Sequence, residues 1–342
     1  MFRKISILAF ISLFALISTY GQDLHFTQFF RLPGQLSPAL QGNALYQFQA
    51  ALDYREQWQS LGAPYQTLAG DLVYRFNYGF DHVSATLTWS TDQSGAGQLQ
   101  MNRLHGGLAY QHQWDWFNIS IGLQLGLIQV KMNEATFPRQ YDPSTGYFDL
   151  SINNGENLYN RPQSAPDLNS GLAVETHAGQ TKINASYGLY HVNTPDFSLS
   201  GTGSTAGYPM RHQFFVQAET PLAGLILNPM LYYSMQDAAQ ELVLGMNAYY
   251  QLPGTDDDPV ALSPGLFWRN NVHHDYGLAA TDALMVYTGL LYHWLDLGLS
   301  YDINVSGLRK ASSYRGGFEL SIAYRYGILH EYRQIIVPCI RY

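Results

Sequence analysis

The sequence LDLGLSYDINV (residues 295–305) alternates apolar residues with polar residues or glycine. After a polar connection, FELSIAYRY (residues 318–326) repeats the alternation. Successive side chains of a β-strand point to opposite faces, so each segment has one apolar and one polar face. Two such segments joined by a loop predict a β-hairpin. The pattern fits a soluble sandwich, with the apolar face inside, or an outer-membrane barrel, with that face toward lipid.

The composition favours the barrel. Of the 342 residues, 13% are charged and 14% aromatic, whereas soluble domains have about 25% charged residues. The mean hydropathy of −0.16 excludes a helical membrane protein. Transmembrane barrels combine an apolar lipid-facing side, small polar lumen residues and interfacial Tyr and Trp. The net charge of −8 argues against nucleic acid as a partner.

Residues 1–21 have the features of a signal peptide. The basic pair Arg3-Lys4 precedes an apolar run, and small residues stand at Thr19 and Gly21, after which we expect cleavage. The sequence has no other apolar run near the length of a spanning helix, so any membrane insertion has to use strands. These features predict an exported protein.

We divide the rest of the chain into an irregular leader on the periplasmic or plug side (22–43), an antiparallel transmembrane β-barrel (44–327) and a periplasmic tail (328–342). About fourteen strands are expected, and most reach the length that a tilted spanning strand needs. Their expected bounds are Ala44–Glu56, Tyr65–Phe76, His82–Ser90, Leu99–Gln113, Trp116–Lys131, Leu168–His177, Thr181–Val192, His212–Thr220, Leu225–Gln236, Glu241–Leu252, Val260–Asn270, Ala283–His293, Leu295–Val305 and Gly317–Tyr326.

The lengths of the connections also favour a membrane barrel. Those after even-numbered strands are short, as at Asn77–Asp81, and those after odd-numbered strands tend to be longer, as at Asn193–Arg211. Outer-membrane barrels have short periplasmic turns and long extracellular loops at opposite ends. An even strand number then puts both termini on the periplasmic side. The longest connection, Met132–Asp167, could fold inward as a plug or rise as a cap.

Four charged residues fall on the polar face of the last two strands: Asp296, Asp302, Glu319 and Arg325. Paired carboxylates can act as acid and base in catalysis. The sequence offers no convincing Ser/His/Asp or Cys/His arrangement to accompany them. We therefore interpret the four as lumen charges and expect no enzyme.

Two other clusters have residue types found in metal sites. His273, His274 and Asp275 share one expected loop, but adjacent histidines in a strand point to opposite faces. Asp256–Asp258 lacks EF-hand spacing. We interpret both as solvated segments and expect no metal and no cofactor. A single cysteine, Cys339, excludes an intramolecular disulfide and is interpreted as a buried or tail thiol.

One cluster closes the first expected strand: Tyr54-Arg55-Glu56-Gln57-Trp58. Arginine is unfavourable on a lipid face, so Arg55 should point into the lumen or lie at the rim. Trp58 should then sit at a membrane interface or hold the first loop. Tyr54, Arg55, Gln57 and Trp58 are therefore candidate structural or partner-binding residues.

At these residues the chain resembles the PorP/SprF family of outer-membrane proteins in the type IX secretion system of Bacteroidota. The most specific match is YREQW (54–58) followed by YQT (65–67). Other matching segments are QDLHFTQF (22–29), LSPA (36–39), YDINVSGL (301–308) and GGFELSIAY (316–324). The ending PCIRY (338–342) is similar to the family's tail, although members usually have Cys-Pro there. Nothing in the long connection matches.

The resemblance implies a non-enzymatic barrel of the secretion and gliding machinery in the outer-membrane lipid. Relatives anchor a large cell-surface adhesin or assist its export, and some recognise its C-terminal secretion domain. They also engage periplasmic secretion subunits or a peptidoglycan-binding adaptor of OmpA-like type. The rival interpretation is a porin or FadL-like channel for small solutes. A soluble exported sandwich and an outer-membrane lipase are more remote alternatives.

Overall fold

The computed structural model describes residues 23–43, 46–58, 64–78, 80–94, 99–132, 140–149, 151–152, 162–197, 207–253, 260–272, 279–307, 309–310 and 312–328. The expected signal peptide, the tail from residue 329 with Cys339, the 256–258 cluster and the 273–275 cluster lie outside these residues. Within the described ranges, no helix is long and apolar enough to cross a membrane.

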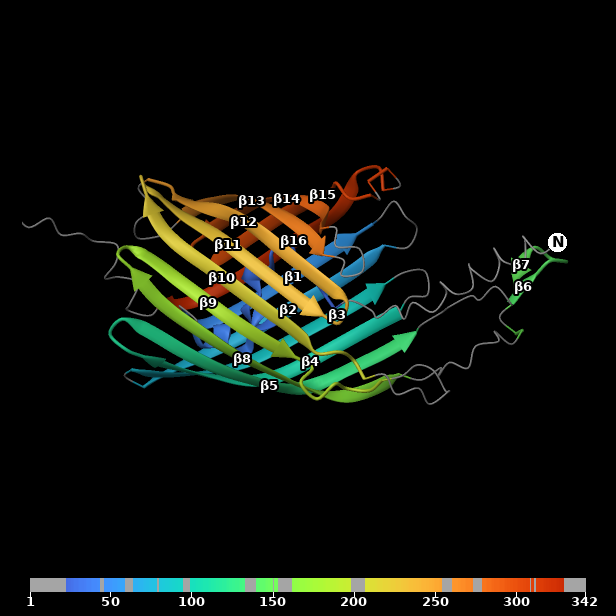
Figure 1. Ribbon diagram of the computed structural model, residues 1–342, viewed down its shortest axis with the longest axis horizontal. Helices are drawn as coiled ribbons and strands as arrows, with labels where there is room; N and C mark the ends of the chain where they lie inside the picture. Colours follow the sequence, from blue (N-terminus) through green and yellow to red (C-terminus); the bar gives the residue numbers. More distant parts are fainter. Residues whose placement is uncertain are drawn as a thin grey trace, which may run out of the picture.

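Fourteen antiparallel strands form a closed barrel, which confirms the predicted fold (Figure 1). Each strand pairs with the next one along the barrel, and β1 pairs with β16 to close it. The strands are β1 (Tyr46–Gln57), β2 (Tyr65–Tyr78), β3 (Asp81–Ser94), β4 (Leu99–Gln113), β5 (Phe117–Met132), β8 (Gln163–Ala178), β9 (Thr181–Tyr190), β10 (Arg211–Leu222), β11 (Leu225–Gln236), β12 (Ala239–Gln251), β13 (Val260–Val272), β14 (Ala279–Tyr292), β15 (Leu295–Asn304) and β16 (Arg315–Ile328).

The apolar half of the alternation faces outward. Leu297, Leu299, Phe318 and Ile322 are 38–43% exposed on the outer surface of the barrel, whereas Asp296, next to Leu297, is buried on the inside. A soluble sandwich would bury the apolar face instead. The chain is therefore an outer-membrane barrel whose outer surface faces lipid.

The two ends of the barrel differ. We call the end that carries the β3–β4, β5–β8 and β9–β10 connections the long-loop end. The opposite, short-turn end carries tight turns such as Ala223-Gly224, between β10 and β11. Both residues of that turn have positive φ, 51° and 83°, as the type I′ turn that matches the twist of paired strands requires.

Strand β8 begins five residues earlier than the sequence predicts, because Pro166 does not stop it. The β5–β8 ladder continues through Leu127↔Pro166, but β9 pairs with β8 only from Ser170 onward. Pro166 therefore has a strand on one side only. A proline, which lacks an N–H, is tolerated at such an edge.

Residues 140–149 of the long connection lie outside the lumen, whereas its last residue, Asp167, belongs to β8 and faces inward. The strands β6 (Tyr141–Asp142) and β7 (Tyr147–Phe148) form a separate two-stranded sheet beyond the barrel end (Figure 1). Tyr147 is 77% exposed there. For these residues the plug interpretation is wrong.

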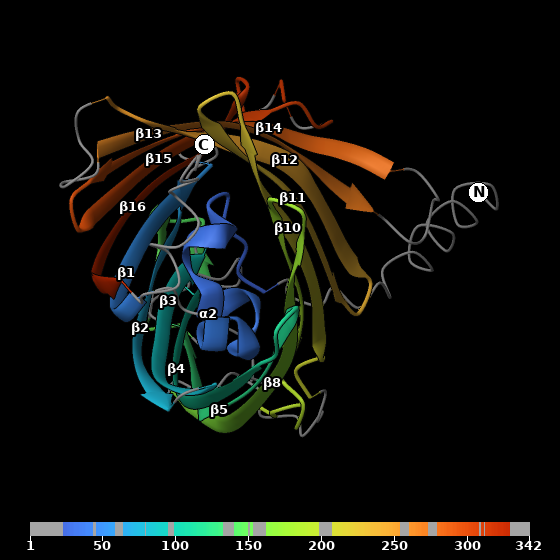
Figure 2. The ribbon, with the colours of Figure 1, turned by 90° about the vertical axis from the view of Figure 1, so that its left-hand side faces the viewer.

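The lumen is filled by the leader instead. Its described part, residues 23–43, forms η1 (Phe29–Arg31), α2 (Pro33–Leu36) and η2 (Pro38–Asn43) inside the barrel (Figure 2). Leu32, Leu36 and Ala39 are at most 3% exposed. The interior of the barrel is therefore a protein core built from strand side chains and leader side chains together.

Candidate functional site

The leader runs through the lumen from the long-loop end toward the short-turn end. At its start, the Asp23 N–H donates to Gln236 at the end of β11, and the Leu24 carbonyl accepts from Arg211 at the start of β10. At its end, Gly42 lies against Ser120, near the turn between β4 and β5. β1 then begins at the short-turn end, beside the end of β16. The described leader therefore starts at the opposite end of the barrel, and the expectation that both termini lie at one end does not hold for Asp23. The candidate site is the surface between the leader and the inner wall.

An aromatic cluster holds the middle of the leader. Phe29 stacks on Tyr232 at 5.1 Å between ring centroids and meets Phe267 edge-on at 6.0 Å. Phe30 stacks on Phe267 at 5.6 Å and meets Tyr287 edge-on at 5.3 Å. Such pairs stabilise by about 0.5–1.5 kcal/mol each beyond the burial of their area.

A row of glycines receives the leader at Leu36–Ala39. Gly122 of β5 pairs with Gly171 of β8, which pairs with Gly188 of β9. A Cβ atom would lie 2.3 Å from the Pro38 carbonyl carbon at Gly122, 2.3 Å from Ser37 Oγ at Gly171, and 2.5 Å from the Leu36 oxygen at Gly188. No side chain fits these positions without moving the leader, so the row is a shaped seat for its main chain.

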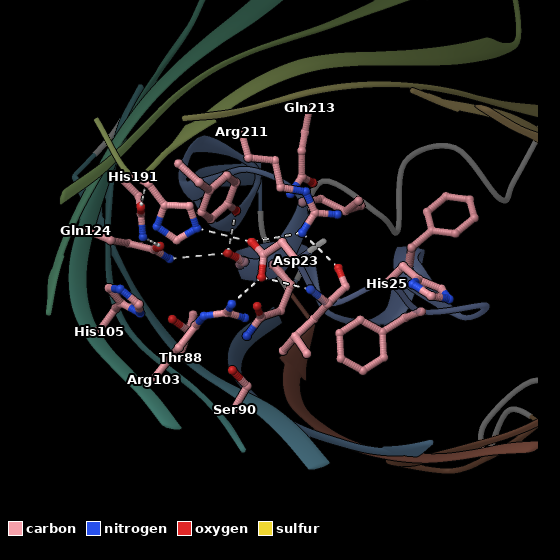
Figure 3. Close-up of a pocket in the computed structure, with 18 of the residues that line it drawn as sticks. Asp23, His25, Thr88, Ser90, Arg103, His105, Gln124, His191, Arg211 and Gln213 are labelled. Atoms are coloured by element: carbon pink, nitrogen blue, oxygen red, sulfur yellow. Dashed lines mark hydrogen bonds and ion pairs between the residues drawn. The ribbon is translucent and has the colours of Figure 1, made fainter. Parts of the chain in front are cut away.

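The tip of the leader is held by charge. Three cationic groups converge on the Asp23 carboxylate: Arg103 in an ion pair, Arg211 Nη1 at 3.1 Å and His191 Nε2 at 3.2 Å (Figure 3). Burial by itself raises the pKa of Asp23, but the charges of Arg103 and Arg211 outweigh it and leave the pKa well below its ordinary value. Asp23 is therefore an ionised carboxylate inside the protein.

His191 connects this cradle to a second carboxylate. Its Nδ1 lies 2.9 Å from Asp167 Oδ1, while its Nε2 faces Asp23. His105 Nε2 meets the other Asp167 oxygen at 2.7 Å. Burial lowers the pKa of His191, but hydrogen bonds to Asp167 and Asp23 outweigh that effect and raise it. A histidine with a carboxylate at each ring nitrogen needs two N–H donors and is positively charged.

A second ion cluster lies farther along the leader. Arg55 Nη2 is 2.8 Å from Asp302, and Arg55 Nη1 is 2.9 Å from Glu319. Arg269 also pairs with Asp302, at 2.9 Å, and with Asp282, at 2.7 Å. The ladder register shifts beside Asp302 on β15 and beside Arg269 on β13. Such irregularities re-aim side chains, here into the cluster.

These carboxylates bind the leader directly. Glu319 accepts the backbone N–H groups of Thr27 (2.8 Å) and Gln28 (2.6 Å), one on each oxygen. The Thr27 hydroxyl donates to Asp302 at 2.5 Å. Charge-assisted bonds of this kind are roughly twice as strong as neutral ones, so the cluster clamps the leader main chain.

A third cluster uses the leader's own arginine. Arg31 Nη1 is 2.9 Å from Asp296 Oδ1 and 3.0 Å from the Tyr287 hydroxyl. Asp296 Oδ2 pairs with Arg325 at 2.6 Å. The four lumen charges named from the sequence thus face the interior in two separate clusters, each completed by the leader.

The cluster at the end of β1 divides between the two faces. Arg55 and Gln57 are buried inside, whereas the half-buried Tyr54 donates from its hydroxyl to Glu56 at 3.0 Å. Trp58 has a positive φ of 60° and meets Tyr65 edge-on at 5.0 Å. Its N–H donates to the Gly316 carbonyl at 3.1 Å. Of the four candidate residues, Arg55 bonds to the leader, donating from Nη1 to the Thr27 hydroxyl at 2.8 Å.

Sequence reasoning missed the residues that hold the leader tip. Arg103, His191 and Arg211 come from separate segments, and no spacing connects them. One signal was present, because Asp23 and Arg31 are the only acidic or basic residues in 22–43 apart from His25. One charge of each sign, in a leader whose other polar residues apart from His25 are uncharged, favours two buried ion pairs if the leader is buried.

Two small cavities lie beside the leader in the described part of the lumen. One cavity of about 30 Å³ lies beside Asp23, His105 and Asn169, and another of about 40 Å³ beside His25 and Asp282. Each has room for a few water molecules at most. No group of His, Cys, Asp and Glu in the described part of the chain could hold a metal ion.

The sequence matches the family model described as type IX secretion system membrane protein PorP/SprF over residues 18–324. No curated protein matches it. Among solved structures, it is similar to the toluene transporter TodX of P. putida, with a TM-score of 0.52 and 12% identity over 86% of this chain and 93% of that chain. The CymD monoaromatic hydrocarbon channel gives a TM-score of 0.50 and 10% identity over 85% and 92%. At such identities the similarity shows the fold alone.

Proposed function

Because the chain belongs to the PorP/SprF family of type IX secretion system membrane proteins, we propose that it is a plugged, non-enzymatic outer-membrane barrel that binds an exported adhesin. In this role it anchors a large cell-surface adhesin or assists its export, and it docks periplasmic subunits of the secretion system or an OmpA-like adaptor. Its work is binding, not chemistry.

The filled lumen is the observation that carries this proposal. A channel for solutes needs a continuous path, whereas the described leader fills the middle of the lumen (Figure 2) and the two cavities beside it measure about 30 and 40 Å³. The leader closes the lumen with three ion clusters, an aromatic cluster and a shaped glycine seat. Such an interior supports a stable attachment point more than a conduit.

The lumen carboxylates support a structural role as well. Asp296, Asp302 and Glu319 are each at most 2% exposed and ion-paired with arginine. A general acid or base has to reach a substrate proton. Carboxylates buried beneath the leader have no such access.

We assign the long-loop end to the cell exterior and the short-turn end, with the start of β1 and the end of β16, to the periplasm. The exposed β6–β7 sheet then belongs to the exterior. Tyr147 and Phe148 are 77% and 48% exposed on it. Exposed aromatic residues outside the membrane mark contact surfaces for protein partners.

Affinity purification from the native membrane tests the proposal. The tagged protein should recover both an exported adhesin and periplasmic secretion subunits. A Tyr147→Ala/Phe148→Ala variant should lose the adhesin and keep the periplasmic subunits, because the changes lie at one end only. Recovery of neither kind of partner by the unaltered protein would contradict the proposal.

The alternative is a channel for small solutes, suggested by the fold that the chain shares with the TodX transporter. Single-channel recording in planar bilayers separates the two functions. The plugged barrel should be silent, and a steady open conductance of the unaltered protein would favour the channel.

A further inference from the structure

The cradle around Asp23 has donors that the leader leaves unused. Arg103 Nε and Ser90 Oγ are buried and have no hydrogen-bond partner among the described residues. Both residues line the small cavity beside Asp23, and they are 8% and 3% exposed (Figure 3). Unpartnered buried donors are unfavourable, and those facing a cavity favour a ligand that accepts hydrogen bonds.

The charges around the cavity specify the chemistry of that ligand. In the described part of the chain, Asp23 is the only carboxylate within ion-pair distance of Arg103 and Arg211. Without it, two buried guanidinium groups would have no carboxylate within ion-pair distance, although Glu241 near Arg211 and Asp92 near Arg103 still act on them from farther away. A site that holds two arginines and a protonated His191 therefore binds an anion, and arginine suits a carboxylate best.

The start of the leader is less covered than the glycine seat. Leu24 and His25 are only partly buried, and the Asp23 side chain beside them is 6% exposed, whereas Leu36 and Ala39 in the seat are 3% and 0% exposed. The tip also lies at the long-loop end. Over the cradle, Tyr208 meets the His191 ring edge-on at 4.7 Å and accepts a bond from Arg103 at 3.3 Å.

We propose that Arg103, Arg211 and His191 form a carboxylate-binding site that Asp23 fills in the closed barrel. In exchange for Asp23, it takes an acidic side chain of an extended peptide segment that enters from the long-loop end. The site follows from the geometry of the cradle. That the segment belongs to an exported protein rests on the proposed function.

Removing the Asp23 carboxylate from the site tests the proposal. In the full-length protein in detergent micelles, Asp23→Ala vacates the cradle. A short labelled peptide of alternating Asp and Ser should then bind about tenfold tighter than it binds the unaltered protein, the effect of about 1.4 kcal/mol of new charge-assisted bonding. A peptide of alternating Asn and Ser should gain nothing. The double variant Asp23→Ala/Arg211→Gln should lose the gain.

Arg31→Gln is the matched control, because it removes a leader ion pair outside the cradle and leaves Asp296 paired with Arg325. It should bind the acidic peptide no better than the unaltered protein. Asp23→Asn, which keeps the shape of the side chain, repeats the test if Asp23→Ala fails to fold. Three outcomes would overturn the proposal. The Asp23→Ala protein binds the acidic and the Asn-containing peptide equally well, Arg31→Gln gains as much affinity for the acidic peptide as Asp23→Ala, or acetate at the same carboxylate concentration displaces the acidic peptide completely. The assay contains no secretion partner, so its failure is distinct from failure of the affinity purification.

Discussion

The leader is held in two different ways along its length. Its first six residues, Asp23–Gln28, which we call the tip from here on, are held by buried charged side chains. Arg103 and Arg211 pair with Asp23, and Glu319 of the Arg55 cluster accepts the N–H groups of Thr27 and Gln28. Its seat, Leu36–Ala39, is fixed by shape against the glycine row. Charge pairs respond to pH and can exchange partners, whereas close packing does neither. We therefore expect such a plug to loosen first at the tip, while the seat remains attached.

The largest expected effect comes from the ion cluster that clamps the tip. Arg55→Gln removes the arginine that pairs with Glu319 and one of the two arginines that pair with Asp302, the other being Arg269. Breaking a buried pair in this way costs about 3–5 kcal/mol of unfolding free energy. Urea unfolding followed by tryptophan fluorescence measures it.

Arg315→Gln provides the control, because Arg315 begins β16 at the same end of the barrel and is exposed. Exposed substitutions stay within about 0.5 kcal/mol. Equal losses in Arg55→Gln and Arg315→Gln would mean that charge does not hold the tip.

The glycine seat should give the next largest effect. Gly171→Val places a side chain where a Cβ alone would lie 2.3 Å from Ser37 Oγ. Overpacking costs about 1–3 kcal/mol, and here the leader has to move away from the wall. Protease cleavage within the leader should therefore become faster than in the unaltered protein.

Gly106→Val is the matched control for the seat, because a Cβ there meets nothing within 4 Å. It should leave the cleavage rate unchanged. If Gly171→Val also leaves it unchanged, the seat does not depend on shape.

The contrast between tip and seat also shows how far sequence reasoning reached. Alternation with a period of two is local, so it predicted the barrel and the inward direction of Asp296, Asp302 and Glu319. Pairing across the lumen is not local. Arg55 meets Asp302 because β1 and β15 both flank β16 in the closed barrel. No local pattern in the sequence predicts which strands this closure of the barrel brings together.

The glycine seat could not be predicted from the sequence either, because it also depends on contacts between distant segments. The alignment of Gly122, Gly171 and Gly188 can be recognised only when the register of β5, β8 and β9 is known, and the long connection separates β5 from β8 in the sequence. In strands rich in glycine, no single residue marks the row. The family segments point to it indirectly, since LSPA (36–39) lies on the seat and QDLHFTQF (22–29) includes the tip.

The smallest predicted effect is a pH dependence that separates the two halves of the leader. The raised pKa of His191 means that its protonated form stabilises the folded cradle. This contribution is complete below the ordinary histidine pKa of about 6.5 and is lost as the pH rises through the raised value. A single pKa unit corresponds to about 1.4 kcal/mol. The tip should therefore loosen in alkaline solution while the seat stays in place.

Cysteine labelling in a Cys339→Ser background measures this difference. One variant carries Leu24→Cys at the tip and another Leu40→Cys beside the seat, where Leu40 is 8% exposed. The ratio of the two maleimide rates should rise with pH, and the same ratio in His191→Gln, which carries the same two thiols, corrects for their own titration. His191→Gln should give a high ratio without that rise, because no imidazolium remains to lose its proton. A flat ratio in the protein with native His191 would show that the cradle does not depend on that charge, and the arginines alone would then hold Asp23.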